Sequence, residues 1–308
     1  MPEQSITFEM LHETALSLGW DDVGITLPEI SKENLESLQS WLQKKLHGKL
    51  HYMENPVRFD PKSLFPEAQT AIIFVTNYKQ PKIELRKDAG AVASYARGRD
   101  YHHVHRKRLK KFIRWLESAS GESNIAKPFS DSSPILEKAL AVQAGLGWFG
   151  KNTLLIHRRF GTFTLLSGVL TSLKIEGIKM EPRLARCGSC TKCLDACPTQ
   201  AFLAPYILDG KKCLSYHLIE SKEPIPDDIR KKNPGYIFGC DICQSVCPHN
   251  VRNPLSLLEE FRPESGVGEY IDEAKLELLE KEPERLHGTP LQRRKVAGLK
   301  HNLIGTPI

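Results

Sequence analysis

Apolar residues recur three or four positions apart near the amino terminus, which predicts helices there. The first predicted helix covers residues 7–18 and ends at Gly19, a residue type that commonly stops helices. A second predicted helix begins after Ser31. Its inward-facing positions are Leu35, Leu38, Trp41, Leu42 and Leu46. A further amphipathic helix is predicted near residues 271–279.

Short apolar runs rich in β-branched residues predict strands. Residues 71–78 form such a run and follow a proline-rich connection at residues 55–66, so we expect a buried strand there. Residues 153–157 and 162–169 predict two more strands, joined by residues 158–161.

A basic helix is predicted after the stretch Tyr95–His102. Its cationic residues are Arg106, Lys107, Arg108, Lys110, Lys111 and Arg114, and they alternate with apolar positions. Such a face is either simply solvated or a surface for phosphate groups. His102, His103 and His105 suggest either a metal site or, as the more ordinary reading, exposed imidazoles on a loop.

The segment from Phe129 to Gly147 contains a second predicted helix start. Ser133 is suited to the N-cap and Pro134 to the first helical position. Asp131 stands just before them and has two interpretations. Its carboxylate either satisfies backbone N–H groups or serves in chemistry, and the residues alone favour the structural role.

Composition and charge narrow the class of protein. The chain has 308 residues, of which 40% are hydrophobic and 26% charged, as expected for a folded globular protein with one large and one smaller domain. It contains no apolar run of the roughly 18–20 residues that a membrane span needs, and its first residues lack a secretory pattern. A reducing cytoplasm is therefore expected. The net charge of +6 hints at a polyanionic partner.

The eight cysteines carry the most specific chemical signal. Residues 187–198 read C-x2-C-x2-C-x3-C-P, and residues 240–248 repeat this pattern without one leading cysteine. This run holds four-iron clusters in bacterial ferredoxins, where the fourth cysteine ligates the other cluster. The crossover rule predicts one cluster on Cys187, Cys190, Cys193 and Cys247. The second cluster is predicted on Cys197, Cys213, Cys240 and Cys243.

Two other uses of cysteine, zinc binding and disulfide formation, fit the spacing less well. Structural zinc sites usually show separate C-x2-C pairs without a third cysteine and a trailing Cys-Pro. A disulfide framework is not expected in a chain of this size without a secretory signal. Two [4Fe-4S] clusters remain the prediction.

With these residues in place, the chain resembles epoxyqueuosine reductase, a cobalamin-dependent iron–sulfur enzyme of tRNA queuosine synthesis. The resemblance covers most of residues 1–260 and rests on four motifs in addition to the cysteine pattern. They are Arg58-x-x-Pro61-x-x-Leu64-x-Pro66, Gly98-Arg99-Asp100-Tyr101-His102, Asp131-Ser-Ser-Pro134-Ile-Leu136-Glu137-Lys138 and Gln143-Ala-Gly-Leu-Gly-Trp148-Phe-Gly-Lys151-Asn152.

The resemblance implies an α+β fold. A nitroreductase-like, cobalamin-binding catalytic domain would occupy residues 1–178, and a ferredoxin-like domain with two [4Fe-4S] clusters would occupy residues 179–260. Residues 261–308 would form a helical basic segment, in the place where longer family members continue into helical repeats that help to hold tRNA.

The resemblance also implies a reaction, the two-electron reduction of epoxyqueuosine to queuosine in a tRNA anticodon loop. It assigns the proton donor to Asp131, for which a raised pKa is expected near the cofactor and away from bulk water. Expected contacts to cobalamin are Arg58, Arg97, Tyr101, His102, Lys151, Asn152, Ser215 and Tyr216. Expected tRNA contacts are Lys222, Arg293, Arg294 and Lys295.

The expected partners are tRNA and an external electron donor, such as flavodoxin or ferredoxin with its reductase. The chain is expected to be a cytoplasmic monomer that does not bind membranes.

Two rival functions share features with this prediction. A reductive dehalogenase-like enzyme would use the same cofactors on a small molecule, but its members usually carry a twin-arginine signal, which this amino terminus lacks. The second rival is a ferredoxin-type electron carrier. A carrier would need little beyond its clusters, so the long amino-terminal domain argues against this function.

Overall fold

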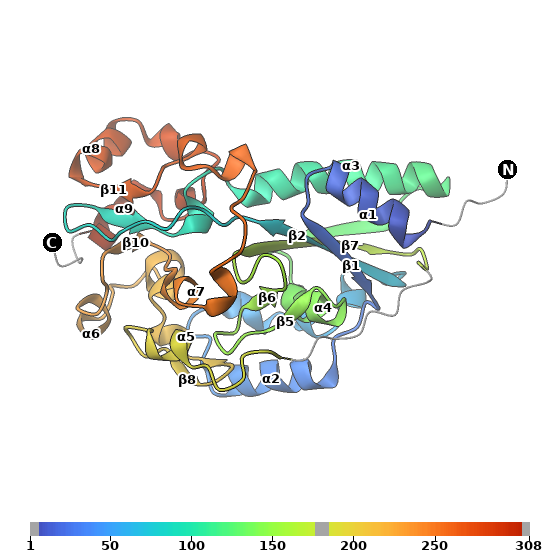
Figure 1. The fold of residues 1–308 in the computed structure, drawn as a ribbon, viewed down its shortest axis with the longest axis horizontal. Helices are drawn as coiled ribbons and strands as arrows, with labels where there is room; N and C mark the ends of the chain where they lie inside the picture. Colours follow the sequence, from blue (N-terminus) through green and yellow to red (C-terminus); the bar gives the residue numbers. More distant parts are fainter. Residues whose placement is uncertain (1–5, 176–184, 304–308) are drawn as a thin grey trace.

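A four-stranded antiparallel sheet forms the centre of the larger part of the fold (Figure 1). The computed structural model describes residues 6–175 and 185–303. The sheet has the order β1 (Asp22–Thr26), β2 (Thr70–Asn77), β7 (Thr164–Thr171) and β4 (Ala126–Ser130). Every residue of β2 is buried, which confirms the strand predicted from this apolar run.

Helices cover both faces of this sheet. Ile72 and Phe74 of β2 pack against α1 (Phe8–Ser17) and α3 (Tyr101–Ser120). Ile73 and Val75, which point to the opposite face because strand side chains alternate, pack against α4 (Glu137–Gln143). Figure 1 shows α1 and α3 on one side of the sheet and α4 on the other. The result is three layers. The carboxyl end of β4 lies close in space to the amino end of α3, where Tyr101 contacts Asp131.

The two helices predicted near the amino terminus from the spacing of apolar residues are both present. The helix α1 ends before Gly19, whose φ of 94° is the left-handed conformation that glycine adopts without strain. The helix α2 (Lys32–Gln43) begins after Ser31, whose side chain caps it by accepting from the amide of Asn34.

The basic helix α3 includes the three histidines, so the expectation of exposed imidazoles on a loop was wrong. Asp100 caps α3 by accepting from the amide of His102 at 2.9 Å, and the helix therefore begins before the histidines. His105 lies on the inner face and is fully buried, with Nε2 3.1 Å from Oγ1 of Thr76.

The predicted helix start at Ser133 and Pro134 was also wrong, because α4 begins only at Glu137. Ser133 instead closes a turn, in which its amide donates to the carbonyl of Ser130 at 2.9 Å and its hydroxyl accepts from the amide of Ser130 at 3.3 Å. Asp131 lies inside this turn.

A second sheet joins segments that are far apart in the sequence. Its central strand β3 (Gly90–Val92) runs parallel to β10 (Tyr236–Phe238) and antiparallel to β11 (Tyr270–Ile271). The predicted helix near residue 275 is present as α8 (Glu273–Lys281), and with α9 (Lys295–Leu303) it packs against this sheet. Each strand comes from a different one of the three predicted domains.

The cysteine-rich part is built from short elements. They are the hairpin β8 (Phe202–Ala204) and β9 (Ile207–Leu208), with the short helices α5 (Lys192–Asp195), α6 (Asp227–Arg230) and α7 (Ile242–Ser245). A π-helical turn, Tyr216–Glu220, follows Cys213. The hairpin β5 (Gly147–Phe149) and β6 (Leu155–His157) reaches toward this part from the larger one (Figure 1). Among the described residues no helix is long and apolar enough to cross a membrane.

Candidate active site

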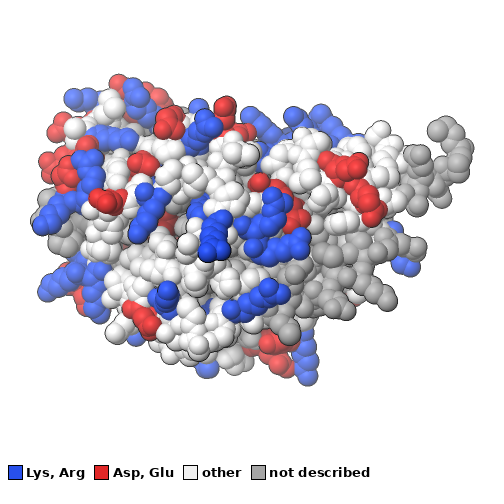
Figure 2. Space-filling view, viewed as in Figure 1, with Lys and Arg blue, Asp and Glu red and all other residues white. Residues whose placement is uncertain are grey.

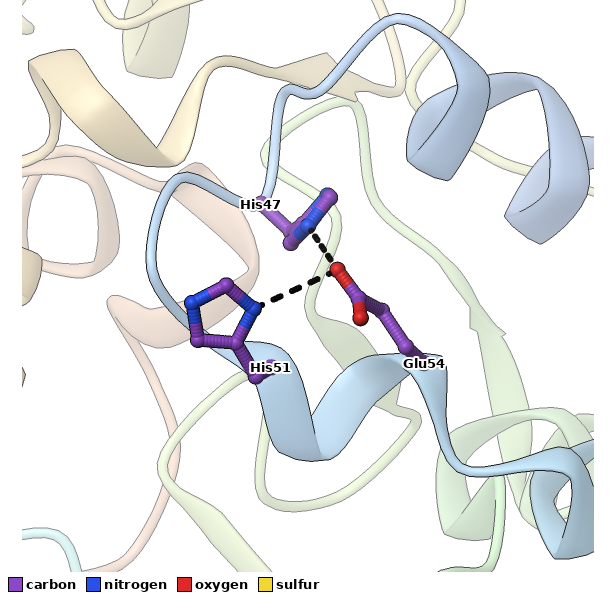
Figure 3. Close-up of side chains that lie close together, drawn as sticks. All are labelled: His47, His51 and Glu54. Atoms are coloured by element: carbon purple, nitrogen blue, oxygen red, sulfur yellow. Dashed lines mark hydrogen bonds and ion pairs between the residues drawn. The ribbon is translucent and has the colours of Figure 1, made fainter.

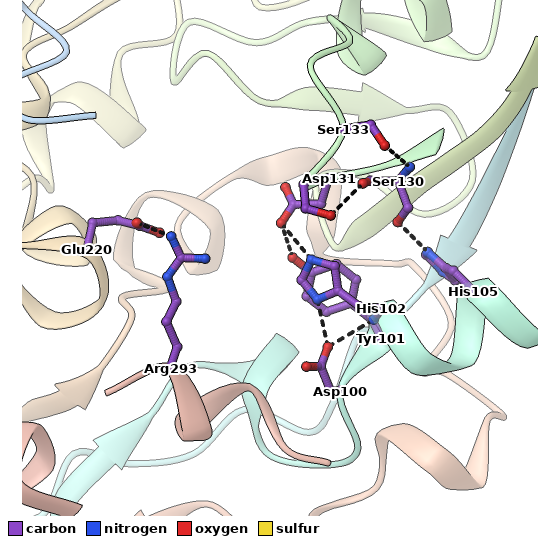
Figure 4. Close-up of polar contacts among 10 residues, drawn as sticks. Asp100, Tyr101, His102, His105, Ser130, Asp131, Ser133, Glu220 and Arg293 are labelled. Carbon is purple, nitrogen blue, oxygen red and sulfur yellow. Dashed lines mark hydrogen bonds and ion pairs between the residues drawn. The ribbon is translucent and has the colours of Figure 1, made fainter. Parts of the chain in front are cut away.

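Asp131 lies on a strained turn directly after β4. Its φ of 25° is unusual for a residue other than glycine, and such strain persists only where the surrounding structure holds it. Two neighbouring residues of α3, Tyr101 and His102, hold the Asp131 carboxylate in place (Figure 4). The hydroxyl of Tyr101 donates to Oδ2 of Asp131 at 2.5 Å, and Nε2 of His102 lies 3.2 Å from the same oxygen.

His102 is placed between two carboxylates. Its Nδ1 lies 2.7 Å from Oδ1 of Asp100, while its Nε2 faces Asp131. Burial alone would lower the pKa of His102, but hydrogen bonds and charge from Asp100 and Asp131 raise it to about 9. His102 is therefore protonated at neutral pH.

The pKa of Asp131 departs from the sequence expectation. Burial acts to raise it, but the hydrogen bonds from His102 and Tyr101 outweigh burial, and the pKa lies below its ordinary value. In this arrangement Asp131 is ionised and the proton is held by His102.

Glu137 is a second carboxyl group behind Asp131. Its Oε1 is buried and has no hydrogen-bond partner within residues 6–175 and 185–303. Burial, with a smaller contribution from the charge of Asp131, raises the pKa of Glu137 to about 8. Glu137 thus differs from Asp100 and Asp131, whose pKa values lie below the ordinary value of an aspartate.

Arg293 and Tyr52 complete the exposed side of the site. The guanidinium of Arg293 pairs with Glu220, which ends the π-helical turn after Cys213, and its charge also acts on Asp131 (Figure 4). The side chains of Asp131 and Arg293 are 53% and 52% exposed, and Tyr52 is 49% exposed. Burial raises the pKa of Tyr52 to about 12, and the charges of Glu220 and Asp131 add to this effect. An open face therefore connects Asp131 to the cysteine-rich part.

The other expected cofactor contacts use their polar groups within the fold. Arg58 is buried and donates to the carbonyls of Tyr52 and Ile135, and Arg97 is buried and donates to those of Val92 and Pro81.

Two more expected contacts, Ser215 and Tyr216, belong to the cysteine-rich part and have polar partners there or in the loop at Lys49. Ser215 is hydrogen-bonded to the thiol of Cys213. The hydroxyl of Tyr216 accepts from the amide of Lys49 at 3.1 Å. Lys151 and Asn152 contact the carbonyls of cysteine-bearing loops, as described below.

The cysteines form two spatial groups. Cys187, Cys190, Cys193 and Cys247 line one small cavity of about 80 Å³. In the other group, burial raises the pKa of Cys213 and Cys240, and nearby Cys197 contributes to both shifts. Burial likewise raises the pKa of Cys243, with contributions from Cys240, Cys213 and Cys197. Each group contains four thiols, the number that one [4Fe-4S] cluster requires.

The expected tRNA contacts differ in their surroundings. Lys222 and Lys295 are exposed. Arg294 is half-buried and donates to the carbonyl of Ser221 and to Oδ1 of Asn302, so part of its role is structural. Figure 2 shows Lys and Arg side chains across the middle of one face, with some acidic side chains among them and others toward its edges.

A further cluster, which the sequence reasoning missed, joins His47, His51 and Glu54 (Figure 3). Their potential ligand atoms all lie within 4.8 Å of one another. Oε1 of Glu54 lies 2.8 Å from Nε2 of His47 and 3.4 Å from Nδ1 of His51, and these bonds lower the pKa of Glu54. The H-x3-H-x2-E spacing was the available signal. Glu220 and Tyr52 offered no signal in the sequence, because their interactions with Arg293 and Asp131 arise only on folding.

Comparison with known proteins identifies two matching families. The family described as "Epoxyqueuosine reductase QueG, DUF1730" matches residues 58–132. The family described as "4Fe-4S double cluster binding domain" matches residues 186–250.

Individual relatives match over most of the chain. The epoxyqueuosine reductase of Cyclobacterium marinum is 39% identical over 262 residues, or 84% of each chain. That of Escherichia coli is 37% identical over 268 residues, or 83% of this chain and 68% of the relative.

Two solved structures share the fold. An epoxyqueuosine reductase with a tRNA-Tyr epoxyqueuosine-modified stem loop has a TM-score of 0.83 at 27% identity, covering 95% of this chain and 78% of that chain. The Bacillus subtilis enzyme, with an aspartate catalytic loop swung out of the active site, has a TM-score of 0.81 at 28% identity and the same coverage.

Proposed function

The chain belongs to the epoxyqueuosine reductase family, and on this premise we propose that it reduces epoxyqueuosine to queuosine in the anticodon loop of a tRNA. The observation that carries the proposal is Asp131, held by Tyr101 and His102 on an open face that Arg293 links to the segment after Cys213. The related structure with a modified tRNA stem loop supports this substrate.

The reaction requires two electrons and two protons. Both carbon–oxygen bonds of the epoxide break, a carbon–carbon double bond forms, and the oxygen leaves as water. Negative charge develops on the oxygen as the ring opens, so a positioned acid lowers the barrier. We propose that Asp131 delivers a proton to this oxygen and that His102, which holds a proton at neutral pH, supplies it through the 3.2 Å contact. Asp100 keeps the imidazole oriented through Nδ1.

The residues near Asp131 fit a cofactor on the open face. Cobalamin, when bound, supplies a strongly reducing cobalt centre for the two-electron step. Tyr52 and Arg293 would hold it, because both are half exposed and both carry hydrogen-bond donors suited to corrin amides. The unpartnered Oε1 of Glu137, behind Asp131, is consistent with a polar group that finds its partner in the loaded enzyme.

The two cysteine groups would bind two [4Fe-4S] clusters, with the ligand sets given by the crossover rule. The match to a 4Fe-4S double cluster binding domain supports this assignment.

We further propose that the first 178 residues form the nitroreductase-like catalytic domain and residues 179–260 the ferredoxin-like domain. The Lys and Arg side chains on the face shown in Figure 2 suit an acidic one-electron donor such as flavodoxin or ferredoxin, and a tRNA substrate supports activity in the cytoplasm.

Single-turnover chemistry tests the proposal. Anaerobic protein with reconstituted clusters and bound cobalamin is reduced, mixed with a stem loop carrying epoxyqueuosine, and the nucleosides are separated by mass. We expect up to one queuosine per enzyme. Protein that binds cobalamin and is fully reduced, yet leaves the epoxide intact, contradicts the proposal. Protein that binds no cobalamin favours an electron carrier instead.

A further inference from the structure

Lys151 crosses from the larger part of the fold to the first cysteine loop. Its Nζ donates to the carbonyl of Gly188 at 2.6 Å and to that of Cys190 at 3.0 Å. The same side chain lines the small cavity formed by the first group of cysteines. Its cationic group is therefore fixed beside four thiols from two other segments.

The turn that carries Lys151 is itself held in place. The amide of Gly150 donates to the carbonyl of Leu154 at 2.8 Å, and the amide of Thr153 donates to that of Gly150 at 2.9 Å. Lys138, next to Glu137, donates to the carbonyl of Thr153 at 2.9 Å. The position of the ammonium group is thus set by the β5–β6 hairpin and does not depend on a freely moving surface chain.

The backbone of Lys151 is anchored to the cysteine-rich part as well. Its carbonyl accepts from the amide of Tyr206 at 3.0 Å. The adjacent Asn152 is 3% exposed, and its Nδ2 lies 3.5 Å from the carbonyl of Cys243, in the second cysteine group. One turn therefore contacts the loops of both cysteine groups, but only Lys151 brings a charge.

A fixed cation affects the affinity of a cluster for electrons. Four thiolates give a [4Fe-4S] cluster a net charge of about −2 when oxidised and −3 when reduced by one electron, so the reduced state gains more from a nearby positive charge. Hydrogen bonds and net charge near the sulfur atoms are among the features that set cluster potentials.

We infer that Lys151 is a positioning residue that holds the Cys187–Cys190 loop and raises the reduction potential of the cluster bound by the first cysteine group. This inference rests on the cluster assignment in the proposed function. The cluster takes one electron from the external donor, and the charge of Lys151 makes that uptake more favourable. Lys151 exchanges no proton and breaks no bond.

Arg186 is the other cation in the cavity wall, and its placement differs. Its guanidinium carbon lies 5.8 Å from the centre of the Trp148 ring, and Arg186 is exposed. A solvated guanidinium is screened by water and salt more than an ammonium group held by two carbonyls. We therefore expect the larger effect from Lys151.

The test is a redox titration of the full chain with both clusters, using dithionite with mediators and following the reduced clusters by electron paramagnetic resonance. Lys151→Met removes the charge and the hydrogen-bond donor, Lys151→Gln removes the charge and keeps a shorter donor, and Lys151→Arg keeps a charge and donors. Lys127→Met, on the exposed side of β4, is the control for a distant loss of charge. The shifted wave is assigned in a Cys213→Ala background, where the first cluster is expected to remain.

We expect the Met and Gln variants to lower the reduced-to-oxidised ratio of the first cluster about tenfold at a fixed potential, which corresponds to a shift of about 59 mV for one electron. The Arg and Lys127 variants should match the wild type. Unchanged potentials in both neutral variants overturn the inference. If the Met variant fails to hold eight irons, the Gln variant decides. Wild-type protein with fewer than eight irons would contradict the cluster assignment itself, before Lys151 is tested.

Discussion

The hydroxyl of Tyr101 and the carboxylate of Asp131 are joined by a 2.5 Å hydrogen bond that spans the start of α3 and the turn after β4. Two consecutive residues of one helix, Tyr101 and His102, thereby fix the position and the charge of the expected acid. The carboxylate depends on a tertiary contact, because its own turn is strained and makes no helix cap.

Replacing Asp131 with Asn should abolish proton delivery while preserving the shape of the turn. Asn is nearly isosteric and tolerates positive φ, so we expect normal folding, full iron content and cobalamin binding. Turnover of epoxyqueuosine should fall by roughly 10²–10⁴-fold, the usual contribution of a general acid. Single-turnover reduction of the modified stem loop measures this.

Asp60, which caps a short helical turn elsewhere, provides a matched control for that experiment. Asp60→Asn should leave turnover unchanged. Near-normal turnover of the Asp131 variant would remove the acid from the mechanism and leave it with a structural role.

His102 should titrate near pH 9, because Asp100 and Asp131 stabilise its protonated form. Its pKa is raised on folding, so its contribution to the free energy of unfolding is fully present below pH 6.5 and is lost as the pH rises through about 9. We expect a loss of roughly 1–3 kcal/mol across that window. Imidazole carbon signals in labelled protein and urea unfolding at each pH measure the two effects.

The Asp100→Asn variant separates this effect from general alkaline instability. It removes one of the two carboxylates, so the His102 signal should titrate at a lower pH and the alkaline loss of stability should begin earlier. If His102 titrates at the ordinary pKa of histidine in wild-type protein, the carboxylates of Asp100 and Asp131 do not stabilise its protonated form.

Cys213→Ala should remove one cluster and spare the other. Cys213 lies with Cys197 and Cys240 in the second cysteine group, whereas the first group lines a separate cavity. Iron analysis of anaerobic protein should fall from about eight to about four irons per chain, since each cluster contains four. Retention of all eight irons would show that the ligand assignment is incorrect.

Binding of the tRNA stem loop should weaken steeply with salt if exposed lysines contact phosphates. Lys222→Ala and Lys295→Ala should each reduce the slope of log affinity against log salt by about one, without altering the cobalamin spectrum. Arg294 is unsuitable for this test because it also holds Ser221 and Asn302. Slopes equal to the wild type would exclude these two lysines from the contact surface.

The sequence predicted those parts of the fold that depend on local pattern. Apolar spacing identified α1, α2 and β2, and cysteine spacing predicted the two groups of four thiols that the fold brings together. The helix start predicted at Ser133 and Pro134 was wrong because Ser133 uses its amide and hydroxyl to close a turn with Ser130 and therefore does not cap the helix. The burial of His105, and the use of Arg58 and Arg97 to hold carbonyls, depend on segments that meet only in the folded chain.

The three-stranded sheet of β10, β3 and β11 has a consequence for how such a protein can be divided. Because β3 bonds to strands from both later parts of the chain, separating either part would leave it with an unpaired edge, and a remaining two-stranded ribbon of so few residues is not stable alone. The cysteine-rich part therefore cannot be transplanted as a portable module. Recombination between relatives should succeed only where all three strands are inherited together.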